Sequence, residues 1–348
     1  MFKKILSLVL ALCLLGGSLV ACENQESIET TKGTEANVEI KDKNHPGNDG
    51  TLSILMVGNS FCYYYVEELY GMLMANPDPN RGYEKVRILN LYYSGCRLDM
   101  HLNWWKTSAA NYQLFQTDEN GRVEMEPAKQ WTLENALLQG KWDYISLQGS
   151  IKSGIYSGRE LHLQIGQTAQ PLLDRFHELH PHAKLLWHRT WPFEVGRISG
   201  STVYTEEKLI TYNASMQATC DYMCNEFDAD KDYDLVMVNS GAAWVRAREA
   251  NAKLETSLIP EEGGLCARKG KRNEDTYPYH LGNPNAGDGY HEGDIGGGQF
   301  LNACVWYETI TGQSCLDNPY KPTWENGNYE LSDEFASLLR NAAHTEAE

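Results

Sequence analysis

Along residues 51–348, short apolar runs alternate with longer stretches in which apolar residues recur every three or four positions. The short runs are rich in Val, Ile, Leu and Tyr, as in strands, and the longer stretches have the period of amphipathic helices. This pattern predicts strands at 52–57, 86–92, 144–147, 184–187 and 235–238, and helices at 65–74, 132–138, 167–179, 206–227, 297–311 and 332–343. Strands that alternate with helices predict an α/β domain, in which helices cover both faces of a five-stranded parallel sheet.

Two segments, 191–204 and 251–287, fit this pattern poorly. Loops as long as the second are uncommon in compact domains and are usually functional or disordered. We therefore predict no helix or strand in either segment.

The first 50 residues differ from the rest. Lys3 and Lys4 precede an apolar stretch at 5–15 that is too short to span a membrane comfortably. Leu-Val-Ala-Cys at 19–22 resembles the lipobox of bacterial lipoproteins, which implies a signal peptide at 1–21 and lipidation of Cys22. An ordinary signal peptide cut near the same residues is the alternative. Residues 22–50 are polar and lack aromatic residues, so we expect a flexible tether that reaches roughly 30 Å.

These features predict an exported bacterial lipoprotein, anchored to the cell membrane or the outer membrane, with one domain at 51–348. The chain has a formal net charge of −17, and loss of residues 1–21, which hold two lysines and no acids, changes this to −19. Such a charge argues against nucleic acid or an anionic surface as a partner. Seven cysteines remain besides Cys13 and Cys22. Because this number is odd, they cannot all pair within the chain, and no disulfide is assigned. Their spacing does not resemble that of a zinc site.

Small and polar residues follow every predicted strand. The five segments are Gly58-Asn59-Ser60-Phe61, Ser94-Gly95-Cys96-Arg97, Gln148-Gly149-Ser150, His188-Arg189-Thr190-Trp191 and Asn239-Ser240-Gly241. Each alone is an ordinary turn after a strand. In an open parallel sheet, however, the carboxyl ends of the strands meet at one edge, where ligands bind. Together the segments predict a single binding site, with Ser60 at the tip of the first strand.

A serine nucleophile needs a base and a group that orients the base. Near the end of the chain, "NAGDGYHEGD" contains Asp288 and His291 and is followed by three glycines at 296–298 and a predicted helix. A short Asp-x-x-His turn can align a carboxylate and an imidazole with a serine from elsewhere in the chain. The same cluster has the composition of a metal site, but it lacks the alternating oxygen ligands of an EF-hand loop, so no metal or other cofactor is expected.

In their order and strand context, these blocks resemble the SGNH/GDSL hydrolase superfamily, most closely a little-characterised bacterial branch with a Gly-Asn-Ser-Phe first block. The resemblance covers residues 51–313. It implies a flavodoxin-like three-layer α/β/α fold with strand order 2-1-3-4-5, and ester hydrolysis. It also implies that Ser60 is the nucleophile, that His291 is the base with Asp288 as its partner, and that the amides of Ser60 and Gly95 hold the oxyanion.

The chain departs from the family pattern at two positions. Asn59 stands where the family usually has aspartate, which removes a charge beside the nucleophile. Gln148 follows the third strand, where the family has a Gly-x-Asn block. Because Gln148 carries the same amide on a longer stem, we predict that it is the third oxyanion donor. The alternative is that Gln148 bonds the backbone of the turn and Ser150 takes this role.

Residues near the carboxyl ends of the strands are candidate substrate contacts: Asn59, Arg97, His188, Arg189 and Trp191. For His188 and Arg189, an ion pair with a neighbouring acid is the alternative. Asp99 and His101 are a rival acid–base pair, but they lie at an expected helix start, where an acid is common.

The predicted function is the hydrolysis of small acyl esters, above all acetyl esters, on carbohydrates. The mature chain has no long apolar stretch for a fatty acyl tail, and the loops "CRLDMHLNWW" and "HRTWPF" hold aromatic, amide and guanidinium groups that suit a sugar. The alternative is a non-catalytic glycan-binding surface lipoprotein on the same fold. A serine, a glycine and an Asp-x-x-His block together favour catalysis.

Overall fold

The computed structural model describes residues 50–62, 64–76, 83–125, 130–148, 159–199, 202–267, 292–324 and 329–345. All of them belong to one compact unit, Ile40–Glu348. The predicted signal peptide and residues 22–49 of the predicted tether lie outside the described residues. So do Ser150, Asp288 and His291.

A seven-stranded sheet forms the centre of this unit. Its strands are β1 (Thr51–Gly58), β2 (Lys85–Tyr92), β3 (Gln113–Thr117), β4 (Val123–Met125), β5 (Tyr144–Gln148), β6 (Lys184–Arg189) and β9 (Val236–Asn239). Their order is β4-β3-β2-β1-β5-β6-β9. The five predicted strands pair in parallel, in the order 2-1-3-4-5 of the sequence expectation.

The prediction of five strands was wrong, because β3 and β4 add an antiparallel extension beyond β2 and make the sheet mixed. Both strands are short, and β4 has only three residues, too few to show a pattern in the sequence. The segment 191–204, for which we predicted no strand, contains the hairpin of β7 (Ile198–Ser199) and β8 (Thr202–Val203). A second small hairpin joins β10 (Thr323–Trp324) to β11 (Tyr329–Glu330).

Eight α-helices accompany the strands in the described part of the chain: α1 (Val66–Ala75), α2 (Leu98–Thr107), α3 (Leu133–Leu137), α4 (Arg159–Leu179), α5 (Glu206–Asp221), α6 (Ser240–Asn251), α7 (Gly298–Thr311) and α8 (Asp333–Ala343). All six predicted helices are confirmed, and a π-helical turn, Tyr222–Phe227, completes the long one predicted at 206–227. Helix α4 begins eight residues before its predicted start. Helix α2 begins at the helix start expected around Asp99 and His101, although its extent was not predicted, and helix α6 was not predicted.

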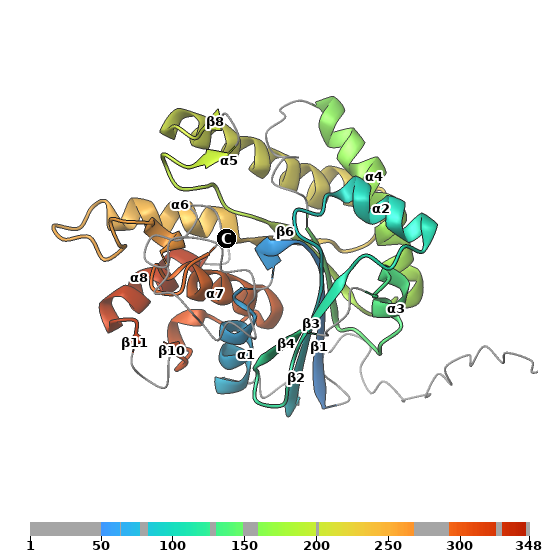
Figure 1. Cartoon of the computed structure of the whole chain (residues 1–348), viewed down its shortest axis with the longest axis horizontal. Helices are drawn as coiled ribbons and strands as arrows, with labels where there is room; N and C mark the ends of the chain where they lie inside the picture. Colours follow the sequence, from blue (N-terminus) through green and yellow to red (C-terminus); the bar gives the residue numbers. More distant parts are fainter. Residues whose placement is uncertain are drawn as a thin grey trace, which may run out of the picture. The chain divides into compact units, whose positions relative to one another are not determined.

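The helices cover both faces of the sheet (Figure 1). Successive side chains of a strand point to opposite faces. Accordingly, Ile54 and Met56 of β1 lie in the core cluster that includes residues of α1, α6, α7 and α8. Leu55 and Val57 lie in a second cluster, with residues of α2, α3 and α4. The ends of the strands are thus held between two separate cores.

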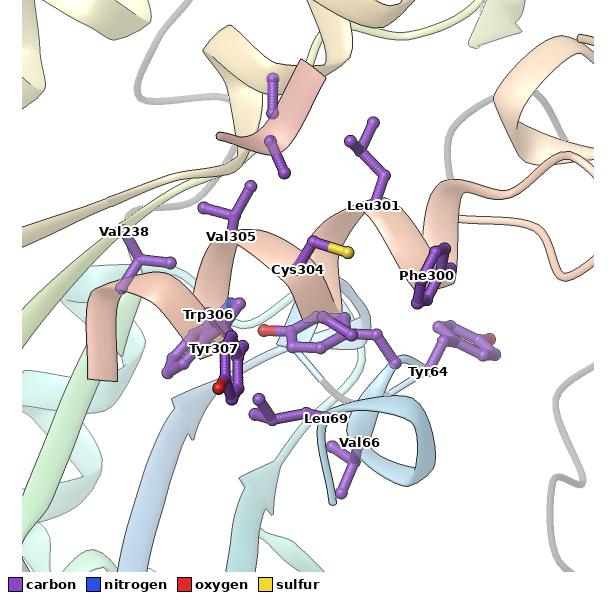
Figure 2. Packing of buried hydrophobic residues seen from close by; sticks show 14 of the residues in the cluster. Tyr64, Val66, Leu69, Val238, Phe300, Leu301, Cys304, Val305, Trp306 and Tyr307 are labelled. Atoms are coloured by element: carbon purple, nitrogen blue, oxygen red, sulfur yellow. The ribbon is translucent and has the colours of Figure 1, made fainter. Parts of the chain in front are cut away.

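Helix α7 is the central helix of the first core. Nearly all of its side chains are buried, and Figure 2 shows them packed against Leu69 of α1 and Tyr64, which precedes that helix. The ring centroid of Trp306 lies 5.8 Å from that of Tyr65 and 5.2 Å from that of His188. Tyr65 follows the β1 turn and His188 lies near the end of β6. Trp306 of α7 therefore packs against residues at the ends of two strands.

Two buried histidines make the stability of this fold depend on pH. Burial lowers the pKa of His101 in α2 and of His188 in β6 to about 3, whereas an unfolded histidine titrates near 6.5. Between these values the unfolded chain binds protons that the folded chain does not, so stability falls as pH decreases from about 6.5 toward 3. The loss is on the order of 1 kcal/mol per pH unit and histidine.

We expect His101→Gln to make this pH dependence shallower, because glutamine carries no titrating proton and still offers a partner to the Tyr112 hydroxyl, 2.7 Å from His101 Nδ1. Urea midpoints measured between pH 7 and pH 4 check this expectation. His182→Gln, at an exposed position, is the control. The same slope in wild type and His101→Gln would contradict the account.

Candidate active site

Ser60 occupies a tight turn at the carboxyl end of β1. It begins a single 3-10 turn, Ser60–Cys62, and its side chain is buried with 7% exposure. The glycine before Asn59 is required by space, since a Cβ on Gly58 would lie 2.6 Å from Gln148 Oε1 and 2.7 Å from Cys62 Sγ. Strand β1 ends at Gly58, one residue after its predicted end. Ser60 therefore lies in a tightly packed turn, close to the side chains of Gln148 and Cys62 that face Gly58.

Asn59 ties this turn to two other strands. Its Nδ2 donates to the carbonyl oxygen of Cys96 at 3.0 Å. Its Oδ1 accepts from the amide of Phe61 at 3.1 Å and from Gln148 Nε2 at 2.9 Å. One side chain thus joins the carboxyl ends of β1 and β5 to the loop after β2. The amide of Asn59 is used inside the protein, so the described contacts do not support its predicted role as a substrate contact.

This arrangement explains why an asparagine suits position 59 better than an aspartate. An aspartate at 59 accepts hydrogen bonds from Phe61 and Gln148, but it has no proton to donate to the Cys96 carbonyl. Two oxygens would then face each other without water. The amide supplies donor and acceptor at once.

Gly95 lies in the loop that Asn59 holds. Its φ of +65° is in the left-handed region, which is the reason for a glycine, because a Cβ there would meet open space. The loop also lies against the β1 turn through a hydrogen bond from the Tyr93 amide to the Gly58 carbonyl at 3.4 Å. Among the described backbone hydrogen bonds, neither the Gly95 amide nor the Ser60 amide is a donor. Both remain available to a ligand at this edge.

Gln148 is the last residue of β5 and is 1% exposed. One hydrogen of its Nε2 goes to Asn59, and the geometry leaves the second amide hydrogen without a protein acceptor in the described residues. Its Oε1 is buried, also without a described partner. The side chain therefore lies beside the Ser60 turn. The predicted role of Gln148 as an oxyanion donor requires this position.

Asn90 is a residue of this site that the sequence expectations did not include. It is 1% exposed in the middle of β2, and its Nδ2 contacts both the carbonyl oxygen and the sulfur of Cys62, the latter at 3.2 Å. It thereby holds the end of the Ser60 turn. Its signal in the sequence is a lone amide inside the apolar strand "VRILNLY".

Asp288 and His291 lie outside the described residues, but Glu292, the next residue, is described and fully buried. Burial raises the pKa of the Cys62 thiol to about 12; the Asn90 hydrogen bond opposes this rise and the Glu292 carboxylate adds to it. The carboxylate is therefore within electrostatic range of Cys62, two residues after Ser60. The residue that follows His291 is thus buried, and its charge acts on Cys62 in the Ser60 turn.

Two predicted substrate contacts lie in the core instead. His188 is 1% exposed, and its Nε2 lies 3.2 Å from the hydroxyl of Ser240. Trp191 is fully buried and stacks on Trp244, with ring centroids 4.8 Å apart and planes at 11°. Both side chains therefore pack inside the protein, and their predicted contact with substrate has no support in the described contacts.

Arg189 is also buried, at 2% exposure. Its Nη1 donates to side-chain oxygens of Gln217 and Asn239, and its Nη2 donates to Asn213 Oδ1 at 2.5 Å. No described acid forms an ion pair with it. Amide oxygens of α5 and β9 thus hold the guanidinium in place of the acid of the alternative ion pair.

Arg97 is the predicted contact that remains on the surface. Its Nε and Nη2 donate to the two carboxylate oxygens of Asp99, at 2.9 and 2.8 Å. The hydrogen bonds from Arg97 lower the pKa of Asp99. The rival pair of Asp99 and His101 is not formed, because His101 is buried and bonded to Tyr112. Arg97 thus stands exposed two residues after Gly95.

Among the described residues, no three His, Cys, Asp or Glu side chains are arranged to hold a metal. The helices in the described ranges include none that is both long and apolar enough to cross a membrane.

Comparison with known proteins shows the relationships of the chain. A family model described as "Domain of unknown function (DUF4886)" matches residues 53–220. The crystal structure of a DUF4886 family protein from Bacteroides uniformis is similar, with 22% identity, a TM-score of 0.59, and coverage of 84% of this chain and 93% of that one. This similarity shows a shared fold. Curated protein sequences gave no match.

More distant similarity is found to enzymes. Axe2, an acetylxylan esterase from Geobacillus stearothermophilus, is 15% identical over 77% of this chain and 96% of that chain, with a TM-score of 0.42. A gut microbial diltiazem-metabolizing enzyme is 13% identical over 75% of this chain and 46% of that one, with a TM-score of 0.41. At these scores the similarities do not bear on the function of this chain.

The three hydrogen bonds of Asn59 predict the effect of an aspartate at this position. Asn59→Asp loses the bond to the Cys96 carbonyl and buries a charge, so we expect a loss of roughly 1–3 kcal/mol in the free energy of unfolding. Urea denaturation at pH 7.5 measures it. Asn103→Asp, at an exposed position of α2, is the control for the charge itself. Equal stability of Asn59→Asp and wild type would show that the Cys96 bond is unimportant.

Proposed function

We propose that this chain is a serine esterase of the SGNH type, with Ser60 as nucleophile, His291 as base and Asp288 as the partner of the base. The observation that carries the proposal is the Ser60 turn itself. Asn59 holds it next to the Gly95 loop, and the amides of Ser60 and Gly95 are not used by other described groups. A serine hydroxyl beside unused backbone donors is the arrangement that acyl transfer requires.

In the proposed reaction, Ser60 Oγ attacks the carbonyl carbon of the ester while His291 accepts the hydroxyl proton. The carbonyl oxygen becomes negative and accepts hydrogen bonds from the amides of Ser60 and Gly95. The intermediate then collapses, and His291 gives its proton to the leaving alcohol. Water, deprotonated by His291, attacks the acyl-serine, which releases the acid and restores Ser60.

Gln148 is proposed as the third oxyanion donor. Its Nε2 has two hydrogens, of which Asn59 takes one. The bond to Asn59 fixes the amide beside the Ser60 turn, so the second hydrogen needs no reorganisation to reach a developing oxyanion. Ser150 is the alternative donor.

The proposed substrate is a small acyl ester, most of all an acetyl ester, on a carbohydrate. The exposed guanidinium of Arg97 lies two residues after Gly95, and Trp105, which is partly exposed, lies in α2 eight residues further along the chain. Guanidinium and indole groups suit hydroxyls and a sugar face. We further propose that the protein is exported and anchored by a lipid on Cys22. No described residue favours the non-catalytic glycan-binding alternative.

Ser60→Ala is the decisive variant. We expect turnover of nitrophenyl acetate to fall by about 10⁶-fold, the loss caused by removing a triad serine in a well-studied hydrolase, with no change in the thermal midpoint. A fluorophosphonate probe should label wild type and the control Ser94→Ala, which changes an exposed serine of the neighbouring loop, but not Ser60→Ala. Normal turnover by Ser60→Ala would end the serine-hydrolase proposal.

The proposed histidine base predicts a pH profile. An ordinary imidazole becomes charged below about pH 6.5 and then accepts no proton, so kcat should fall tenfold per unit as the pH decreases below this value. His291→Ala should remove most activity, and Asp288→Ala less, because water partly replaces an orienting carboxylate. Circular dichroism at each pH controls for unfolding. A flat profile from pH 8 to pH 5 would exclude the histidine.

The acyl group is tested with a series of nitrophenyl esters from C2 to C12, beside acetate release from acetylated xylan, acetylated sialic acid and acetylated peptidoglycan. We expect the C2 ester to be cleaved fastest and at least one glycan to release acetate. Fastest cleavage at C8 or longer, with no acetate from any glycan, would replace the carbohydrate proposal by a lipase or a thioesterase.

A further inference from the structure

An ion pair behind the candidate active site holds three parts of the chain together. Glu194 lies in the chain between β6 and β7, and its Oε1 lies 2.8 Å from Nη2 of Arg248 on α6. The same oxygen accepts a hydrogen bond from the Leu265 amide at 3.0 Å. Both charged side chains are mostly buried, with 21% and 27% exposure. We call these two residues the Glu194–Arg248 pair.

A series of aromatic contacts leads from this pair to the nucleophile. The Arg248 guanidinium lies 5.3 Å from the ring centroid of Trp244. Trp244 stacks on Trp191 at 4.8 Å, and Trp191 contacts Phe61 at 5.1 Å between ring centroids. Phe61 is the residue after Ser60. Flat, fully buried rings transmit position well, because a packed core allows little displacement.

Leu265, which donates its amide to Glu194, lies in a segment that contacts the chain just after residues 268–291. The amide of Gly293 donates to the Leu265 carbonyl at 3.0 Å, and the amide of Gly296 donates to the Ala267 carbonyl at 2.9 Å. The segment 264–267, which precedes residues 268–291, is therefore bonded to the segment 292–298, which follows them. His291 is adjacent in sequence to this second segment.

Glycines make this contact close. A Cβ on Gly293 would lie 2.0 Å from the Ala267 carbonyl oxygen, and one on Gly298 would lie 2.5 Å from the Leu265 carbonyl oxygen. On the other side, Gly264 has a φ of +55°, and a Cβ there would lie 2.6 Å from the Glu194 carboxylate. The glycine-rich run after His291, which the proposed reaction does not use, thus allows two backbones to meet where Glu194 binds one of them.

We propose that Glu194 is a positioning residue of the esterase. The Glu194–Arg248 pair fixes segment 264–267, and through it the chain that follows His291, to the aromatic stack that ends at Phe61. It thereby ties the chain that follows His291 to the residues around Ser60, although neither Glu194 nor Arg248 belongs to the proposed triad. This inference rests on the proposed function, in which His291 is the base.

A positioning role predicts an effect on turnover rather than on binding. A displacement of about 1 Å from a change remote from the chemistry can cost about 10²-fold in rate. Glu194→Gln keeps the size of the side chain and removes its charge, and Arg248→Met does the same for the arginine. We expect each to lower kcat for nitrophenyl acetate by roughly 10–100-fold, with KM within about twofold of wild type. Fluorophosphonate labelling of Ser60 should slow in parallel, since it needs the same base.

The matched control is the Glu134–Arg175 ion pair between α3 and α4, which packs on the other face of the sheet and has similar exposure, 33% and 23%. Glu134→Gln and Arg175→Met break a comparable pair and should leave kcat unchanged. Thermal midpoints of all variants are measured, and assays are run well below the lowest. The double variant Glu194→Gln/Arg248→Met should be no slower than the worse single variant, because both act through one contact.

The outcomes separate this inference from the proposal beneath it. If wild type shows no esterase activity and no probe labels Ser60, both fail. If wild type is active but Glu194→Gln has the same kcat as Glu134→Gln, only the positioning role fails. Additive losses in the double variant, or losses confined to KM, also overturn it. A kcat loss at Glu194 and Arg248 that is absent at Glu134 and Arg175, and not additive, supports it.

Discussion

The buried amide of Asn59 is the constraint on which the candidate site depends. Most buried polar groups are hydrogen-bonded, and the Asn59 amide has partners on the loop after β2, in its own turn and at the end of β5. The Ser60 turn cannot shift without breaking at least one of these bonds. The side chain that was expected to contact substrate instead sets the distances among the groups that do the proposed chemistry.

Packing below and behind the turn supports the same geometry. Trp306 of α7 packs against Tyr65 and His188, and Asn90 holds the end of the turn from β2. Trp191 and Trp244 occupy the space behind Phe61. This chain has enough aromatic residues to suggest a sugar-binding surface, but many of them are buried in the core. The exposed candidates for a ligand surface are Arg97 and α2 beside the Gly95 loop.

The sequence predicted the elements whose pattern is local. Strands β1, β2, β5, β6 and β9 are apolar runs between turns, and their lengths are right to within one or two residues. Helix α6 lacks an apolar stripe, because its buried positions include Ser240, Gly241 and Ala243, and so it was not predicted. Strand β4 has only three residues, and β3, "QLFQT", has just two apolar residues between glutamines, so neither shows the apolar run of the predicted strands.

The residues of the candidate site likewise fall into those that the sequence predicts and those that it does not. That Ser60, Gly95 and Gln148 follow strand ends is visible in the sequence, because parallel strands bring those ends together. The burial of Trp191 depends on Trp244, and the role of Asn59 depends on Cys96 and Gln148, which are 37 and 89 residues away. No local pattern carries such partners. Asp288 and His291 lie outside the described residues, and their roles stay a prediction.

The central claim is that Asn59 positions three hydrogen-bond donors, the amides of Ser60 and Gly95 and Gln148 Nε2, around the oxyanion that forms beside Ser60. A crystal structure of the protein after reaction with a fluorophosphonate tests it most directly, because the phosphonyl oxygen imitates the oxyanion. The account predicts an adduct on Ser60 Oγ, with this oxygen about 2.7–3.1 Å from the amides of Ser60 and Gly95 and from Gln148 Nε2, and with the Asn59 bonds intact. An adduct on another residue, or an oxygen that points away from all three donors, would contradict the account.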